Sequence, residues 1–266
     1  MKRKTLVLML VIMTIVCAGG IFYMCCDNRR NNKAGSDSVS LNKALEAYIE
    51  KAFDADQIIH LNGVLPHDKK IAAEHDIPEQ ELSKTPTDIL CRHFVGSPMR
   101  VWFGMYDDVN FGITRAIRAS ATLSALINRE DMVEGMIKMY SETIIDPENT
   151  QAAELGSISM ALMASDELLT YPPIFERTKG YGKDLLLHLC NRYKRMREVN
   201  EKCESKGENP PYGASLSSAR KVALLLLKRF DNKLYDKWQD QFKDKGKLTK
   251  DEDRLFEEIE QQLKTH

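Results

Sequence analysis

The residues best suited to metal chemistry form two His-Asp dipeptides, His67-Asp68 and His75-Asp76. Imidazole and carboxylate groups are common metal ligands, but a complete set of them must converge on one ion. The only histidine upstream of these dipeptides is His60, which is too close to His67 to lie on a separate helix. Both dipeptides also lie in a stretch interrupted by prolines. We therefore expect solvated loop histidines and no metal site.

Ser218 and Lys221 have the Ser-x-x-Lys spacing that can place a hydroxyl nucleophile one helical turn from a lysine. Neither a Lys-Thr-Gly nor a Ser-Asp-Asn sequence accompanies the pair. The pair is therefore interpreted as part of the first turns of a helix, and no catalytic residue is assigned.

Other residue types that serve as general acids or bases are scattered along the chain. Those considered for a carboxylate/His hydrolase site are Asp107, Asp108, Glu154, Asp166 and His93. Asp166 and Glu167 lie near the end of an expected helix, where acidic residues usually form a solvated face. A hydrolase is therefore kept as the alternative function.

The cysteines divide equally between the apolar N-terminus and the rest of the chain: Cys17, Cys25 and Cys26, then Cys91, Cys190 and Cys203. Three is an odd number, so the second group cannot form a complete disulfide set. No Cys-x-x-Cys pair occurs, and no spacing with histidine is typical of zinc. We expect buried thiols and no cofactor.

A basic run with interleaved tyrosines, residues 179–197, could contact anionic lipid or an acidic partner, although a solvated helix face is the simpler interpretation. Aromatic and arginine side chains also contribute much of the energy of protein interfaces. On these grounds, the predicted partner-binding residues are Trp102, Tyr106, Tyr171, Tyr181, Tyr193, Arg192, Arg195 and Tyr212.

Net charge argues against nucleic acid as a partner. Six of the 38 basic residues but only one of the 39 acidic residues precede Ala34, so the remainder of the chain carries a net charge of −6. Such a domain lacks the positive field that attracts a phosphate backbone. We expect a protein partner instead.

The N-terminus predicts a membrane segment. Residues 5–26 contain no charged side chain and follow a basic start. As a helix they would span about 33 Å, enough to cross the hydrocarbon layer. A signal anchor is the first interpretation of residues 1–26, with a cleaved signal peptide and a lipidated cysteine as alternatives. Residues 27–40 are polar and predict a flexible linker. The short basic start predicts a cytosolic N-terminus and an extracytoplasmic (periplasmic) domain, and the absence of an Asn-x-Ser/Thr sequon fits a bacterial protein.

Apolar residues recur at helical spacing through most of the remaining chain, and no segment predicts a strand. The expected helices are residues 41–59, 100–109, 111–128, 131–144, 148–169, 181–204, 216–230, 233–242 and 250–263. Residues 61–84, broken by glycine and proline, predict a loop with at most one short helix. The helices rich in small residues, 111–128 and 148–169, should lie centrally.

These patterns predict an all-α protein, an irregular multi-helix bundle or else a short α-solenoid, behind one N-terminal membrane helix. Residues 41–230 would form the core domain, and residues 231–266 a charged helical hairpin. The expected function is a membrane-tethered protein-interaction module of the cell envelope, of the immunity or scaffold type. A helical hydrolase of the envelope is the alternative.

Overall fold

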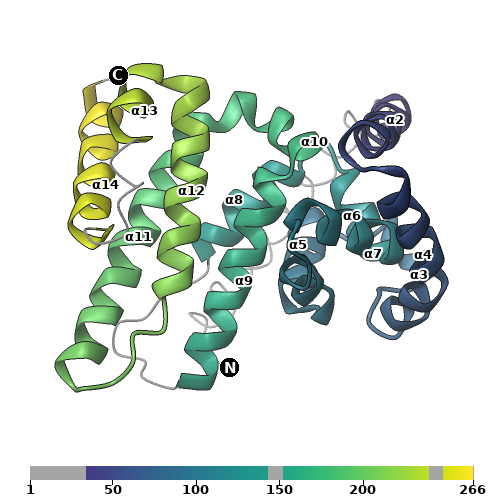
Figure 1. Cartoon of the computed structure of the whole chain (residues 1–266), viewed down its shortest axis with the longest axis horizontal. Coiled ribbons are helices and arrows are strands. Elements are labelled where there is room, and N and C mark those ends of the chain that lie inside the picture. The colour runs from purple at the N-terminus through teal and green to yellow at the C-terminus, as the bar shows by residue number, and fades with distance from the viewer. Residues whose placement is uncertain (1–33, 143–151, 240–247, 266) are drawn as a thin grey trace, which may run out of the picture.

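The computed structural model describes residues 34–142, 152–239 and 248–265. These residues form helices joined by short connections, and no strand occurs among them. The α-helices α2–α4 lie at one end of the molecule, α11–α14 at the other, and α5–α9 between them (Figure 1). In the described part of the chain, no helix combines the length and apolarity needed to span a bilayer. The apolar segment within residues 1–26 lies outside the described residues.

The prediction of an all-α multi-helix bundle is confirmed. In a solenoid each helix pair contacts only its neighbours along the chain. Here α5 packs against α8 and α9, α9 packs against α12, and α3 packs against α6. The elements, including two 3-10 helices named η, are α2 (Ala34–Ala52), α3 (Ala55–Ala73), α4 (Glu79–Leu82), α5 (Thr87–Gly96), η1 (Pro98–Gly104), α6 (Val109–Ala119), α7 (Ala121–Ile127), α8 (Met132–Glu142), α9 (Ala152–Thr170), α10 (Pro172–Phe175), η2 (Glu176–Tyr181), α11 (Gly182–Ser205), α12 (Gly213–Phe230), α13 (Asn232–Gln239) and α14 (Leu248–Thr265).

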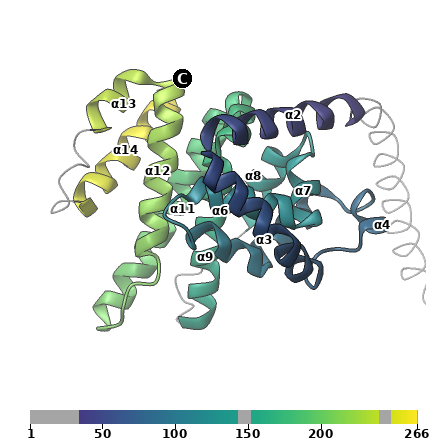
Figure 2. The same cartoon turned by 45° about the vertical axis from the view of Figure 1, so that its right-hand side comes forward.

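The N-terminal part of the domain contains more helix than the sequence indicates. Helix α2 already begins at Ala34, so the second half of the expected linker is helical (Figure 2). Helix α3 continues through most of the segment expected to be a loop, with Pro66 inside it. A capping box starts α3, because Asp54 accepts a hydrogen bond from the backbone N–H of Gln57 and the Gln57 side chain accepts one from the backbone of Asp54. Burial of Leu61 and other side chains against the core then offsets the hydrogen bond that Pro66 removes.

The segment expected as one helix over residues 111–128 is divided at Ser120, which has an extended backbone conformation. Ser120 caps α7 by accepting a hydrogen bond from the backbone N–H of Leu123. Asp76 completes the cap, since its carboxylate accepts hydrogen bonds from the Ser120 hydroxyl and from the backbone N–H groups of Ala121 and Thr122. One of the two aspartates considered as metal ligands therefore caps a helix.

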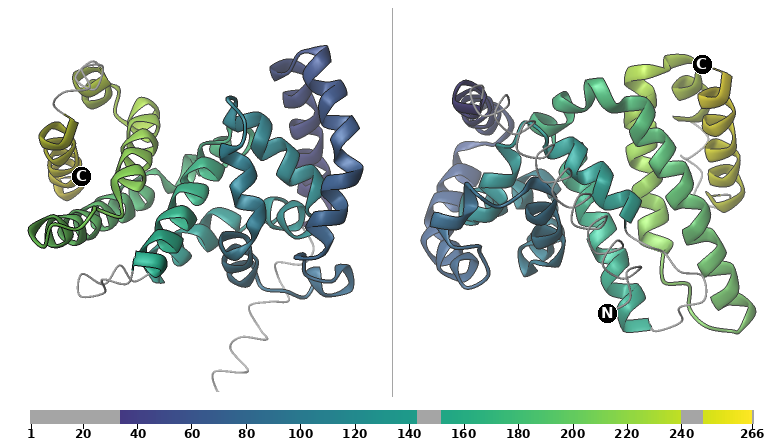
Figure 3. Two further views of the ribbon diagram at one scale, coloured as in Figure 1. Left: turned by 60° about the horizontal axis from the view of Figure 1, so that its bottom comes forward. Right: turned by 180° about the vertical axis from the view of Figure 1, so that it is seen from behind.

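The helices α11–α14 form a layer at the C-terminal end (Figure 3). Helix α12 packs against α9 on one side and α11 and α13 on the other, and α14 packs against α11. The buried apolar stripe of the last two helices includes Leu234, Trp238, Leu255, Phe256 and Ile259. The expected turn of the hairpin, around residue 246, lies outside the described residues.

Candidate functional site

Four of the predicted partner-binding aromatics are buried, which corrects the expectation that they are available to a partner. Trp102, Tyr171, Tyr193 and Tyr212 all lie within the hydrophobic core. The Tyr171 hydroxyl shares a hydrogen bond of 2.7 Å with the Thr114 hydroxyl. Their size explains the correction, because a large aromatic side chain buries the most apolar area and dominates core energetics as well as interface energetics.

Arg192 is also buried, and its role is internal. Its Nη2 atom donates to both carboxylate oxygens of Asp166, at 2.9 and 2.7 Å, and the Tyr140 hydroxyl donates to Asp166 Oδ1 at 2.8 Å. The guanidinium carbon lies 4.7 Å from the centre of the Tyr140 ring. Asp166, expected on a solvated face, is 1% exposed. The three side chains thus form a buried, charge-compensated cluster that joins α8, α9 and α11.

The basic run in α11 contacts the C-terminal helix. Lys194 Nζ lies 2.5 Å from Glu260, and the Tyr193 hydroxyl donates to Asp253 at 2.7 Å. Of the predicted binding residues, only Arg195 is exposed. The half-buried Tyr181 donates its hydroxyl hydrogen to Glu134 at 2.9 Å. The eight predicted residues do not form a common surface.

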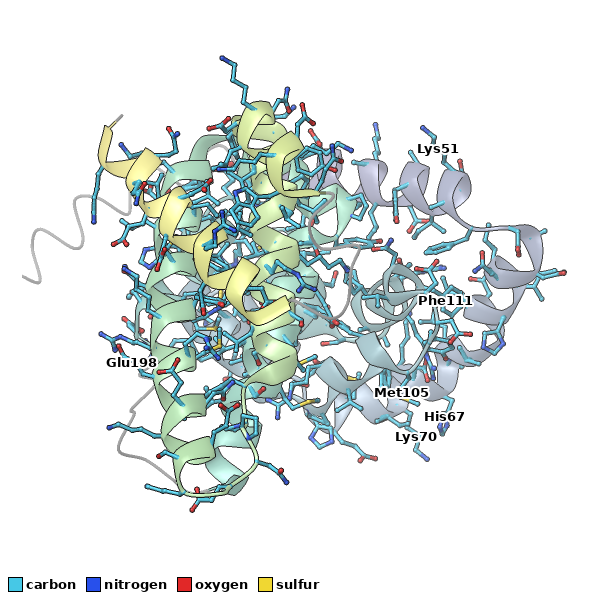
Figure 4. The ribbon with its side chains drawn as sticks, turned by 60° about the vertical axis from the view of Figure 1, so that its left-hand side comes forward. Lys51, His67, Lys70, Met105, Phe111 and Glu198 are labelled. Atoms are coloured by element: carbon cyan, nitrogen blue, oxygen red, sulfur yellow. The ribbon has the colours of Figure 1, made fainter. Side chains whose placement is uncertain are left out.

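Asp68, the aspartate of the first His-Asp dipeptide, is fully buried and pairs with Arg115. Arg115 Nη2 lies 2.5 Å from Asp68 Oδ1, its Nε donates to the other oxygen, and its Nη1 donates to the Tyr106 hydroxyl. The guanidinium also lies 4.8 Å from the centre of the Trp102 ring. His67 is exposed and lies near Lys70 at the edge of the molecule (Figure 4). Within the described residues, no three His, Cys, Asp or Glu side chains come together as a metal site.

The described cysteines are buried free thiols. Burial raises the pKa of Cys91 and of Cys190 to about 12, so neither is a thiolate nucleophile at neutral pH. His93 is half-buried on α5 and lies outside the groove described next. The side chain of Glu154 lies outside the described residues.

The best candidate site is a groove between α9 and α12, extending to the N-terminus of α6. It consists of two cavities of about 440 and 420 Å³ that share Glu167, Thr170 and Lys221. The larger cavity is further lined by Met163, Asp166, Ala214, Ser217, Ser218, Arg220, Val222 and Leu224. The smaller one is further lined by Asp107, Asp108, Val109, Asn110 and Leu225. We call these residues the α9–α12 groove.

Three charged side chains of the groove stand apart from the hydrogen bonds and salt bridges of the described fold. Within the described part of the chain, Glu167, Lys221 and Asp107 form no side-chain hydrogen bond or salt bridge. Burial raises the pKa of the half-buried Glu167 carboxyl, and the positive charge of Lys221 opposes that shift. Asp108 differs from them, because it caps α6 by accepting a hydrogen bond of 2.9 Å from the backbone N–H of Asn110.

Sequence reasoning identified parts of this groove without joining them. Asp107 and Asp108 were considered as carboxylates, and Ser218 and Lys221 as a nucleophile and its lysine; all four line the groove. Glu167 was missed, since its position beside Asp166 indicated a solvated face. The signal available in the sequence was a pair of adjacent acids in a helix that is rich in small and apolar residues.

No protein-family model matches the chain, and neither a curated protein nor a solved structure shows significant similarity to it. The fold and the groove therefore define the class only as far as an all-α helical bundle with a charged, partly apolar groove.

Proposed function

We propose that the chain is a non-enzymatic interaction module of a bacterial cell envelope, tethered to the membrane by residues 5–26, and that a protein partner binds in the α9–α12 groove. One observation carries the proposal. Glu167, Lys221 and Asp107 line one groove and form no side-chain hydrogen bond or salt bridge among the described residues, whereas buried charges such as Asp68 and Asp166 are paired inside the fold. Charges left free beside apolar surface are suited to complementary contacts with a partner.

The composition of the groove supports a protein partner in particular. Met163, Val222 and Leu224 supply apolar surface along one cavity, and Lys221 and Glu167 supply opposite charges at its junction with the other. Apolar side chains and charged groups that can meet complementary charges both occur in protein interfaces. Immunity-type and scaffold proteins both work by such binding, and a membrane tether raises the local concentration of each near its partner.

Site-specific photocrosslinking tests the proposal. A photoreactive residue replaces Lys221 in the full-length chain, and a matched variant carries it at Lys183, an exposed lysine of α11 outside the groove. We expect a stoichiometric crosslinked protein from native membranes with the groove variant and none with the control. Equal labelling from both positions, or no product from either, would contradict a partner in the groove. Release of the chain from membranes by alkaline carbonate would separately contradict the tether.

A second candidate function is the hydrolysis of an envelope polymer. The observation that favours it is the cavity lined by Asp107, Asp108 and Glu167, because hydrolysis of a polymer needs a carboxyl that acts as general acid and a second one that acts as base or nucleophile. Burial raises the pKa of Glu167, as the acid of such a pair requires. Release of soluble fragments from purified peptidoglycan by the full chain, and its loss in Glu167→Gln, would favour this function over the interaction module.

A further inference from the structure

The smaller cavity of the α9–α12 groove carries an excess of negative charge. The carboxylates of Asp107, Asp108 and Glu167 line it, and Lys221 is the one basic side chain among its described lining residues. Three carboxylates against one ammonium group give a formal charge of −2 when all four groups are ionised. Asp107 and Lys221 are exposed, so the cavity reaches solvent and a side chain of a partner can enter it.

The negative charge continues on α2 beside this cavity. Burial raises the pKa of the Tyr171 hydroxyl, and the negative charges of Glu46 and Asp108 raise it further. After burial, Asp108 has the same effect on the pKa of Tyr48, whose ring centre lies 5.3 Å from that of Tyr171. Carboxylates of α2 and of the turn before α6 therefore act on the same region, and Glu46 is exposed there. Such an area attracts a cation.

The larger cavity differs, because the fold already pairs the buried charges that line it. Asp166 pairs with the buried Arg192. Arg220 pairs with Glu252 of α14. The charges that remain lie at the junction that this cavity shares with the smaller one. The negative charge of the groove is therefore concentrated at its α6 end.

Apolar side chains from both helices line the larger cavity. Met163 comes from α9, and Val222 and Leu224 come from α12. The two helices pack against each other and run in the same direction (Figure 1). Met163 lies four residues before Glu167 on α9, a separation of about 6 Å along the helix axis. Apolar surface and negative charge thus follow each other along the groove within about one helical turn.

We propose that the protein partner inserts a lysine or arginine side chain into the smaller cavity and places a neighbouring apolar side chain on the larger one. This inference rests on the proposed function and specifies the chemistry of the bound segment. A long aliphatic stem that ends in a cation suits a cavity of about 420 Å³ with carboxylates around it. Lys221 repels the incoming cation and so directs it towards Asp107. Complementary charge favours a basic segment over an acidic one, and the apolar wall favours a peptide over a free polyamine.

Selection from a random dodecapeptide library displayed on phage tests the inference with the full-length chain in detergent. Counter-selection on Ala214→Trp, which fills the larger cavity from an exposed position, removes peptides that bind elsewhere. We expect the enriched peptides to carry lysine or arginine within one helical turn of an apolar residue. Their affinity, measured by fluorescence anisotropy, should fall about tenfold in Glu167→Gln and in Asp107→Asn. The matched control is Glu198→Gln, an exposed acid of α11 outside the groove (Figure 4), and it should leave the affinity unchanged.

Charge reversal distinguishes a direct contact from a general loss of negative charge. Asp107→Lys places a cation at an exposed position of the smaller cavity, and the matched peptide carries glutamate in place of its basic residue. Each change alone should weaken binding about tenfold, and the two together should restore most of the affinity. If the two losses simply add, the basic residue does not contact the cavity and the inference is wrong.

The outcomes separate this inference from the proposed function. Groove-dependent peptides without a basic residue would overturn the inference while supporting a protein partner in the groove. The same holds for photocrosslinking at Lys221 if the captured segment contains neither lysine nor arginine. Spermidine that binds the wild-type chain as tightly as the selected peptides, and binds Glu167→Gln more weakly, would assign the cavity to a free polyamine and contradict both. If no enriched peptide depends on the groove, both are contradicted as well.

Discussion

Replacement of Asp68 by asparagine separates a structural role for the His67-Asp68 dipeptide from a metal-binding role. Asp68 is fully buried, and the Arg115 side chain that it pairs with is 12% exposed. Asparagine keeps the size of the side chain but removes its charge, so the Arg115 cation would lose its counter-ion. The dipeptide would then be needed for stability, not for metal.

The expected cost follows from the environment of Arg115. Removing one partner of a buried ion pair costs about 3–5 kcal/mol. Arg115 would retain its contacts with the Tyr106 hydroxyl and the Trp102 ring, and it is partly exposed, so the lower end applies. A loss of about 3 kcal/mol corresponds to a decrease in Tm of about 6–12 °C for a domain of this size. The double substitution Asp68→Leu with Arg115→Met should recover at least half of the loss, because neither charge remains buried alone.

Urea unfolding of the full-length chain in detergent would measure these differences by circular dichroism and by tryptophan fluorescence. Trp102 lies 4.8 Å from the Arg115 guanidinium and reports on the pair, while Trp238 reports on the C-terminal end. His67→Ala is the matched control and should be neutral, because His67 is exposed. A loss below about 1 kcal/mol for Asp68→Asn, which is the range of exposed pairs, would refute the reasoning. If a chelator lowered the Tm of the wild-type chain but not that of Asp68→Asn or His67→Ala, a bound metal would be indicated instead.

Three further predictions follow from named contacts. Gly112→Ala should destabilise the domain by about 3 kcal/mol, because the added Cβ would lie 2.4 Å from a backbone oxygen of η1. Gly63→Ala has open space around it and should stabilise α3 by about 0.8–1 kcal/mol. Chemical unfolding measures both substitutions, and equal effects would contradict the packing around Gly112. Burial raises the pKa of Glu167, so ionisation of this carboxyl lowers the stability of the fold as the pH rises through the folded-state pKa, and has no effect below the unfolded-state pKa. Glu167→Gln should therefore raise Tm at pH 7 but not at pH 3.5. An equal change in Tm at both pH values would show that the substitution acts through packing. The thiols of Cys91 and Cys190 should resist alkylation at pH 8 until the chain unfolds, as peptide mass spectrometry can show, since burial raises both pKa values to about 12; labelling of the native chain would contradict their burial.

Helix type and the start of several helices could be predicted from the sequence because those signals are local. Ser97-Pro98 starts η1, where the Ser97 hydroxyl accepts a hydrogen bond from the backbone N–H of Met99, and the apolar periodicity of residues 181–204 becomes α11. Pro66 and Ser120 were misjudged for the same physical reason. Whether a proline is tolerated, or a serine interrupts a helix, depends on burial and on a distant cap such as Asp76, 44 residues from Ser120.

The candidate site was less predictable, because partners for charges lie far away in the chain. Arg192 and Asp166 are 26 residues apart, and Lys194 and Glu260 are 66 residues apart. A basic run at helical spacing has the same pattern whether water or a second helix faces it. The sequence therefore predicted an exposed basic face on α11. In the fold, that face packs against α14.

The same limit explains why Glu167 was missed and why it now marks the site. Charges at helical spacing are common. What distinguishes this pair is that the fold partly buries Glu167 and brings the positive charge of Lys221 near it. Within the described part of the chain, neither side chain forms a hydrogen bond. Partial burial of an unpaired carboxyl costs stability, and native folds keep such groups where a ligand or partner supplies the missing contact. If the groove has no partner, Glu167→Gln should improve stability at neutral pH and leave the cellular role of the chain unchanged. If the groove is the site of function, the same substitution should stabilise the domain but weaken the cellular role of the chain. A carboxylate with only a structural role would not produce these two opposite effects.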